Sequence, residues 1–188
     1  MANETFNILK ILIENPEARY SIRKLSLLRK INYKSAYQAV MKLKKQGIIE
    51  FENLGNVINC SFNKKINPLV FKVEYERRKE LLKNKNFKII YERLNELKFP
   101  FIALMFGSYA KKTARKSSDI DLLVIAEKQK EIEQAIELIP LKIHLTIISY
   151  KEFIEMNKSK EFSVVSEANK NNIIMLGIEE YYRLIKNA

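Results

Sequence analysis

The 188-residue chain is basic, with 34 Lys and Arg against 22 Asp and Glu, and its 47% hydrophobic content suits a packed core rather than wholesale disorder. One cysteine, Cys60, and one histidine, His144, exclude an intramolecular disulfide, a cysteine-based zinc cluster and a His-rich metal site. No apolar run approaches the roughly 20 residues that span a bilayer, and the N-terminus has no apolar h-region, so we expect a cytoplasmic protein with no membrane partner.

The positive charge is concentrated in the front half of the chain. The formal charge is +7 over residues 1–65, +4 over 66–100 and +1 over 101–188. Such an asymmetry is typical of a polyanion-binding segment. A solvated, lysine-rich surface that aids solubility gives the same count, and charge alone leaves both interpretations open.

The first 65 residues predict three short helices followed by a β-hairpin. Apolar residues at helical spacing give helices over 3–14, from the N-cap Ser21 onward, and over about 34–46. We expect the second helix to bury Ile22, Leu25 and Leu28. Alternating residues around Asn53–Asn56 then give two strands and a hairpin. This order of elements is typical of a winged helix-turn-helix domain, which we expect over residues 1–65.

In a winged helix-turn-helix, the recognition helix lies in the major groove of DNA, and here that is the third helix. Gln38 could read an adenine edge, while Lys34 and Lys45 suit phosphate contacts. The hairpin has no Lys or Arg between Ile48 and Phe62, which weakens a minor-groove contact. Double-stranded DNA is the expected partner, with a docked protein as the alternative. The DNA-binding candidates, besides the hairpin tip near Asn53–Asn56, are Arg23, Lys24, Lys34, Ser35, Tyr37, Gln38, Lys42 and Lys45.

The rest of the chain predicts a connector and an α/β domain. A charged helix from Asn67 to about Lys83 predicts a helical linker over residues 66–86, and a further helix covers 87–97. Three strands follow: a continuous apolar run typical of a strand buried on both faces, and two later segments. These strands are expected over 101–106, 119–126 and 141–149. Helices are expected over 127–138, 150–157 and 159–170, and a short apolar stretch, a glycine turn and a final helix close the chain.

Two carboxylates stand at the start of the second of these strands. Asp119 and Asp121 are two residues apart, so strand geometry would place both side chains on one face, about 7 Å apart at the Cα atoms. Paired carboxylates are costly unless a cation neutralises them. Hard divalent ions such as Mg²⁺ prefer these oxygen ligands, with phosphate oxygens completing the shell. The pair predicts a metal site.

A glycine and a serine follow the first buried strand. Gly107 permits close backbone approach, and free N–H groups with the Ser108 hydroxyl could hold a terminal phosphate. Basic residues in the loop that follows, Lys111, Lys112, Arg115 and Lys116, could offset triphosphate charge. The candidates for nucleotide binding are Gly107, Ser108, Lys111, Lys112 and Ser118.

Ten residues separate Ser108 from Asp119, giving the pattern Gly-Ser-x10-Asp-x-Asp. This pattern resembles the signature of the DNA-polymerase-β-like nucleotidyltransferase superfamily, specifically its minimal branch, and the resemblance covers about residues 87–188. Members usually read Gly-Ser-x-Ala-Arg-Gly and then Ser-Asp-Ile-Asp-Leu. This chain reads Gly107-Ser108-Tyr109-Ala110-Lys111-Lys112 and then Ser118-Asp119-Ile120-Asp121-Leu122. The resemblance implies an α+β protein in which the winged helix-turn-helix is joined by the helical linker to a small nucleotidyltransferase-type α/β domain with a mixed sheet.

In such families the Gly-Ser turn holds an NTP, usually ATP in adenylylating members, and the carboxylates hold Mg²⁺. A third carboxylate on the later strand normally completes the site, and the position that we align with it holds His144. Imidazole is a poor Mg²⁺ ligand but an acceptable Mn²⁺ ligand, and it could also act as a general base. The alternative is that His144 only lines a cleft that has lost full activity. The catalytic candidates are Asp119, Asp121 and His144.

Two functions follow, with a purely structural interaction domain as a third. The first is a nucleotidyltransferase acting on a protein or small-molecule acceptor, as in antitoxins of this branch that adenylylate a HEPN-type toxin. A DNA-binding N-terminal domain would suit an antitoxin that represses its own operon. The protein could be a homodimer. The second is a DNA-binding regulator whose degenerate domain senses nucleotide.

Overall fold

The computed structural model describes residues 2–55, 57–115, 117–159 and 161–187. The chain divides into two compact units, Met1–Val73 and Glu74–Ala188. The boundary falls inside the helix α4 (Pro68–Leu81), so that the charged helix of the expected linker contributes residues to both units. Within the described ranges, no helix combines the length and the apolar character that crossing a membrane requires.

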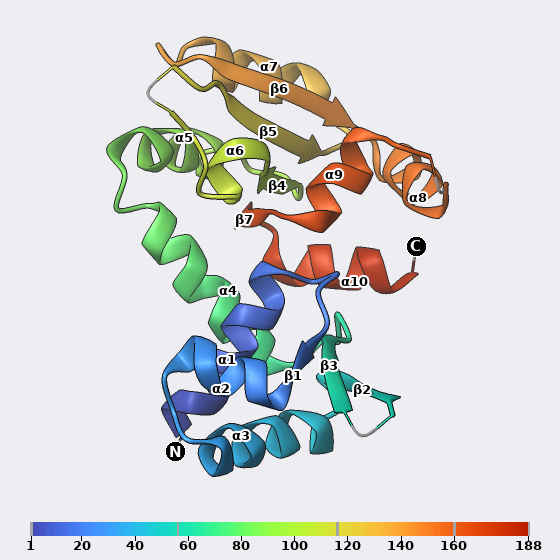
Figure 1. Ribbon diagram of the computed structural model, residues 1–188. Coiled ribbons are helices and arrows are strands. Elements are labelled where there is room, and N and C mark those ends of the chain that lie inside the picture. Colours follow the sequence, from blue (N-terminus) through green and yellow to red (C-terminus); the bar gives the residue numbers. More distant parts are fainter. Residues whose placement is uncertain (1, 56, 116, 160, 188) are drawn as a thin grey trace. The chain divides into compact units, whose positions relative to one another are not determined.

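Before α4, the described residues of the first unit form three helices and a small antiparallel sheet (Figure 1). The sheet has the order β1-β3-β2, and Leu54 pairs with Val57 across the hairpin turn. The sequence predicted the hairpin but not β1, a two-residue strand. The elements before α4 are α1 (Ala2–Glu14), β1 (Tyr20–Ser21), α2 (Ile22–Arg29), α3 (Tyr33–Lys45), β2 (Ile49–Leu54) and β3 (Val57–Phe62).

Side-chain caps set where α2 and α3 begin. The Ser21 hydroxyl accepts the backbone N–H of Lys24 at 3.1 Å, and the Asn32 side chain accepts that of Ser35 at 2.8 Å. One expectation about the core was wrong, because Leu28 is 46% exposed although Ile22 and Leu25 are buried. The eight-residue helix α2 presents only one side to the core, and Leu28 lies off that side.

The second unit is built on a four-stranded mixed sheet of order β6-β5-β4-β7. The strands are β4 (Ile102–Met105), β5 (Ile120–Ile125), β6 (Ile143–Ile148) and β7 (Ile173–Leu176). Only β5 and β6 are parallel, and β4 pairs antiparallel with both β5 and β7. The closing apolar stretch is therefore a strand, which its four-residue length alone did not indicate.

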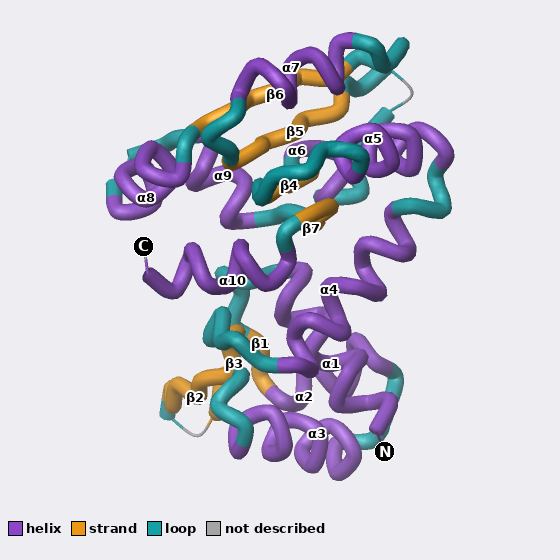
Figure 2. The backbone as a smooth tube through the Cα atoms, turned by 180° about the vertical axis from the view of Figure 1, so that it is seen from behind, coloured by secondary structure: helices purple, strands orange, loops and turns teal. Residues whose placement is uncertain are grey.

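Helices pack against the sheet, and the strands β4 and β5 are buried almost throughout, whereas β6 is mostly half-buried. The helices are α5 (Lys85–Asn95), α6 (Gly107–Ala110), α7 (Gln129–Glu137), α8 (Tyr150–Lys158), α9 (Val164–Lys170) and α10 (Ile178–Asn187). Phe87 of α5 and Ile132 of α7 belong to one core cluster with the even-numbered β5 residues Leu122 and Val124. The odd-numbered residues of β5 therefore face the other way. Both views show α8 and α9 together near the carboxyl ends of β5 and β6 (Figures 1 and 2).

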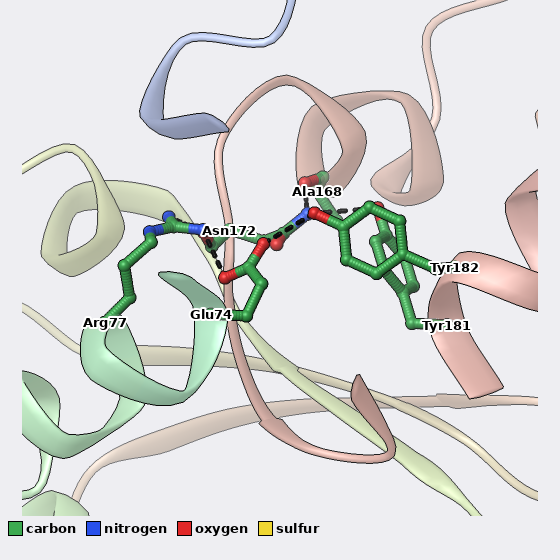
Figure 3. A network of polar contacts seen from close by, with 6 residues as sticks. All are labelled: Glu74, Arg77, Ala168, Asn172, Tyr181 and Tyr182. Carbon is green, nitrogen blue, oxygen red and sulfur yellow. Dashed lines mark hydrogen bonds and ion pairs between the residues drawn. The ribbon is translucent and has the colours of Figure 1, made fainter. Parts of the chain in front are cut away.

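A buried polar network ties α4 to α10 within the second unit (Figure 3). The Glu74 carboxylate accepts the Tyr182 hydroxyl at 2.8 Å and pairs with the Arg77 guanidinium at 2.6 Å. Arg77 also donates to the backbone carbonyl of Asn172, whose side chain donates to the Tyr181 hydroxyl. Burial raises the pKa of both tyrosines, so that each keeps its proton and donates.

Candidate functional site

The turn after β4 brings a glycine directly against Asp121. The backbone N–H of Phe106 donates to the Asp121 carbonyl at 3.1 Å, which fixes the turn beside β5. Gly107 has a φ of +65°, and a Cβ atom on it would lie 2.0 Å from the Asp121 Oδ2. Only glycine allows this approach. The two motifs quoted from the sequence therefore meet at one point, with Gly107 and Ser108 opening the short helix α6 instead of a loop.

The loop between the motifs is held by its own residues. The Tyr109 hydroxyl donates to the Ser118 carbonyl at 3.3 Å, and the Tyr109 ring packs edge-on against Phe87 with centroids 5.2 Å apart. The Ser118 hydroxyl accepts the Arg115 N–H at 2.9 Å, and Thr113 N–H donates to the Ser108 carbonyl at 2.9 Å. Sequence reasoning left Tyr109 without a role, although an aromatic residue inside the Gly-Ser-x-Ala pattern was a usable signal.

The basic residues of this loop, which are candidates for contacting phosphate, differ in their contacts and exposure. Lys111 forms an ion pair with Glu167 of α9, with Nζ and Oε1 3.0 Å apart. Lys112 and Arg115 are exposed, and Lys112 has a φ of +59°. Glycine adopts this left-handed conformation at lower cost than lysine does. Lys116 lies outside the described residues.

Asp121 and His144 face each other across the parallel strands β5 and β6. The two residues are register partners, and His144 Nδ1 lies 3.3 Å from Asp121 Oδ1. The Asp121 side chain is 26% exposed, whereas the His144 side chain is 70% exposed. By strand alternation both lie on the face opposite α5 and α7. A carboxylate and an imidazole on this face can together bind a cation or exchange a proton.

Asp119 is exposed and precedes the first residue of β5, Ile120. The strand β5 therefore begins one residue later than the expected 119–126, and the expectation that Asp119 and Asp121 share one face stays a prediction. The strand begins where the Ile120 N–H donates to the Lys142 carbonyl, at 2.9 Å. Asp119 is the last residue of the loop that precedes β5, the strand that carries Asp121.

Among the described residues, no group of three or more His, Cys, Asp or Glu side chains is placed to hold a metal ion. Mg²⁺ is usually bound by one or two carboxylates together with ligand phosphates rather than by an all-protein cage. Asp121, the neighbouring Asp119 and the Gly107 turn, where a Cβ would fill the space beside the carboxylate, fit that kind of site.

The DNA-binding candidates lie on α2 and α3 of the first unit. Seven of them are exposed, and Ser35 is partly buried because its N–H completes the Asn32 cap. Tyr37 stacks on Tyr33, with ring centroids 6.3 Å apart. Ala36, Val40 and Leu43 are buried on the opposite side of α3. Asn56, at the hairpin tip, lies outside the described residues. The exposed candidates are Arg23, Lys24, Lys34, Tyr37, Gln38, Lys42 and Lys45.

A comparison with known families finds a match within the second unit. Residues 88–180 match the family model described as polymerase beta, nucleotidyltransferase. This match supports a polymerase-β-like nucleotidyltransferase domain, and the mixed four-stranded sheet fits such a domain. The matched range includes Gly107, Asp121 and His144. No curated protein and no solved structure matches the chain.

Proposed function

We propose that the domain matched over residues 88–180 binds an NTP together with a divalent metal ion and transfers its nucleotidyl group to a protein or small-molecule acceptor. The observation that carries this proposal is the contact between the Gly107 turn and Asp121. A phosphate held at the turn would lie beside the carboxylate that could bind the metal.

Each residue of the candidate site would have a separate role in holding the nucleotide or the metal ion. The Ser108 hydroxyl and the backbone of the Gly107 turn would hold the terminal phosphates, while Asp119 and Asp121 would hold Mg²⁺ or Mn²⁺. When bound, the metal ion would polarise the α-phosphate and stabilise the attacking and leaving oxygens. The exposed Lys112 and Arg115 would approach phosphate oxygens, and Lys111 would leave Glu167 to do so. Ser118 would act by shaping the loop, since its hydroxyl accepts the Arg115 N–H.

His144 would take the place of the usual third carboxylate. Its imidazole lies beside Asp121 and is largely exposed, so it is accessible to an acceptor hydroxyl. A neutral imidazole can accept the proton of that hydroxyl as its oxygen attacks the α-phosphorus, while the bond from the α-phosphorus to the bridging oxygen breaks and pyrophosphate leaves. For the acceptor we propose a partner protein, such as a HEPN-type toxin, with ATP as the donor. This role is that of a cytoplasmic antitoxin that could act as a homodimer.

Incubation with α-labelled NTP, in Mg²⁺ or Mn²⁺ and with candidate acceptors, tests the transfer. We expect label on the acceptor with the wild type, no label with Asp121→Asn, and wild-type labelling with Glu131→Gln, which removes an exposed carboxylate on α7. Nucleotide should stabilise the wild-type fold by about 2.7 kcal/mol at 100 times its Kd. If nucleotide stabilises the fold while no acceptor is labelled, the proposed transfer fails and the binding site alone stands.

A DNA-binding regulator with a catalytically degenerate, nucleotide-sensing domain is the second candidate. It is favoured by the exposed side of α3, where Lys34, Gln38, Lys42 and Lys45 follow one another at spacings of three or four residues. In this proposal residues 1–65 are a winged helix-turn-helix domain, residues 66–86 a helical linker and 87–188 the sensing domain. The α3 side chains would then contact the bases and phosphates of a major groove.

Binding to a duplex from the protein's own promoter tests this candidate. The affinity should fall with salt, and Lys42→Ala and Lys45→Ala should each lower the slope of log K against log salt by about 1. Gln38→Ala should instead relax the sequence preference. Lys72→Ala, an exposed lysine on α4, is the matched control. Duplex affinity that is insensitive to salt, or to these α3 substitutions, would exclude it.

A further inference from the structure

A hollow of about 530 Å³ lies between α4 and α5, and it shares no residue with the site described above. It is lined by Tyr75, Arg78 and Lys79 of α4, which share one side of the helix, and by Leu82 in the turn that follows. All of these residues belong to the second unit. The volume is within the range of pockets that hold small ligands.

The side of α5 that lines the hollow has the same spacing. Lys88, Tyr91 and Glu92 stand three and four residues apart, and Lys83 lines the turn between the helices. Residues of both helices therefore line this open hollow, and α4 and α5 follow each other directly in Figure 2. Each helix contributes one tyrosine and at least one cation.

Arg78 is held in a fixed position at this hollow. Its guanidinium carbon lies 4.9 Å from the centroid of the Tyr75 ring and 5.5 Å from that of Tyr91. Its Nη1 donates to the backbone carbonyl of Met175 in β7 at 3.3 Å. A planar cation flanked by two aromatic rings and tied to the sheet is pre-organised, so little rotamer freedom remains to be lost on binding an anion.

The remaining charges at the hollow are mostly positive. Four cations line it, Arg78, Lys79, Lys83 and Lys88, against one carboxylate, Glu92. Lys83 pairs with Glu80 at 2.6 Å and Lys88 with Glu92 at 3.6 Å, but these pairs are exposed and exchange readily with a stronger anion. Lys79 is exposed and has no ion-pair partner in the described part of the chain. The Tyr75 ring is 43% exposed and offers a surface for a planar group.

We propose that the hollow between α4 and α5 binds a nucleotide unit, with its phosphate at Arg78 and Lys79 and its base stacked on Tyr75. Lysine and arginine beside exposed aromatic rings are the combination by which proteins hold single-stranded nucleic acid. The unit could be part of a single strand or a free nucleotide, which the arms of the experiment separate. A duplex, whose bases are already stacked, does not fit this chemistry.

The experiment measures fluorescence anisotropy of a labelled single-stranded hexa-adenylate with the full chain, and competition by AMP. Tyr75→Ala should lower the affinity by at least about fivefold, the lower bound for loss of one stacked base. Lys79→Glu should weaken binding further and reduce its salt dependence. Lys130→Glu on α7 and Phe162→Ala, which remove an exposed lysine and an exposed ring elsewhere, should leave the affinity unchanged.

Each result of this experiment either supports nucleotide binding at the hollow or overturns it. Hexa-adenylate that binds well above AMP identifies a single strand, and AMP that binds as tightly identifies a free nucleotide. The proposal is overturned by the absence of binding for both probes, by equal losses in the test and control variants, or by a duplex that binds with the same dependence on Tyr75. Asp121→Asn should not change binding, since a loss there would assign the probe to the Gly107 turn instead.

Discussion

Replacing Gly107 by alanine tests the link between the two motifs. The new Cβ would lie 2.0 Å from Asp121 Oδ2, 2.8 Å from Cγ and 3.2 Å from Cβ, so the carboxylate must move. A φ of +65° adds about 1–2 kcal/mol of backbone cost for an L-residue. Overpacking adds about 1–3 kcal/mol. We therefore expect a loss of about 2–5 kcal/mol in the free energy of unfolding, together with loss of nucleotide binding.

Gly55→Ala supplies the matched control for this substitution. Gly55 has a similar φ of +58°, but a Cβ there meets nothing within 4 Å, so only the backbone cost applies. Reduced freedom of the unfolded chain offsets part of that cost equally in both variants. Denaturant unfolding gives the stabilities, and nucleotide-dependent thermal shifts give binding. Gly107→Ala that binds nucleotide normally, with no greater destabilisation than Gly55→Ala, would refute the reasoning.

Other substitutions probe the rest of the fold. Arg77→Met leaves the Glu74 carboxylate buried and uncompensated, so urea unfolding should show a loss of about 3–5 kcal/mol, much of it recovered when Glu74→Gln is added. Burial raises the pKa of the Cys60 thiol from 9.0 to about 11. Because the folded state then holds this proton more tightly, stability should fall as pH rises from about 9 to 11, by about 2 kcal/mol more in the wild type than in Cys60→Ala; identical pH profiles would contradict this. Lys112→Gly should raise stability by about 1 kcal/mol by relieving a φ of +59°, whereas Lys112→Ala should not.

Local signals in the sequence predicted most of the secondary structure. The apolar run before Gly107 marks β4, whose four residues are all buried, and Ser21 marks the start of α2 through its cap. Such features are visible because a cap or a fully buried strand depends on neighbours in the chain. The family resemblance likewise agrees with the match over residues 88–180.

What the sequence did not predict depends on contacts between distant segments. The strand β7 exists because Ile173–Leu176 pair with β4, about 70 residues earlier in the chain. The start of α9 at Val164, later than expected, follows from the Ser163 and Ser166 capping box, which competes with a continuous helix over the preceding residues. The ion pair between Lys111, directly after α6, and Glu167 of α9 could not be predicted from either segment alone.

In this domain, the residues proposed to bind the nucleotide are held more firmly than the residue proposed to assist nucleotidyl transfer. Gly107 and Asp121 are fixed by a buried turn and a central strand, so a phosphate and metal site here would need little rearrangement. His144 stands on the edge strand β6 with a largely exposed imidazole, and its contact with Asp121 orients it. In the proposed transfer, a group held this loosely would contribute little to nucleotide binding, but it would decide whether an acceptor loses its proton. Substituting His144 should therefore alter transfer far more than nucleotide affinity, whereas changes at Gly107 should abolish both.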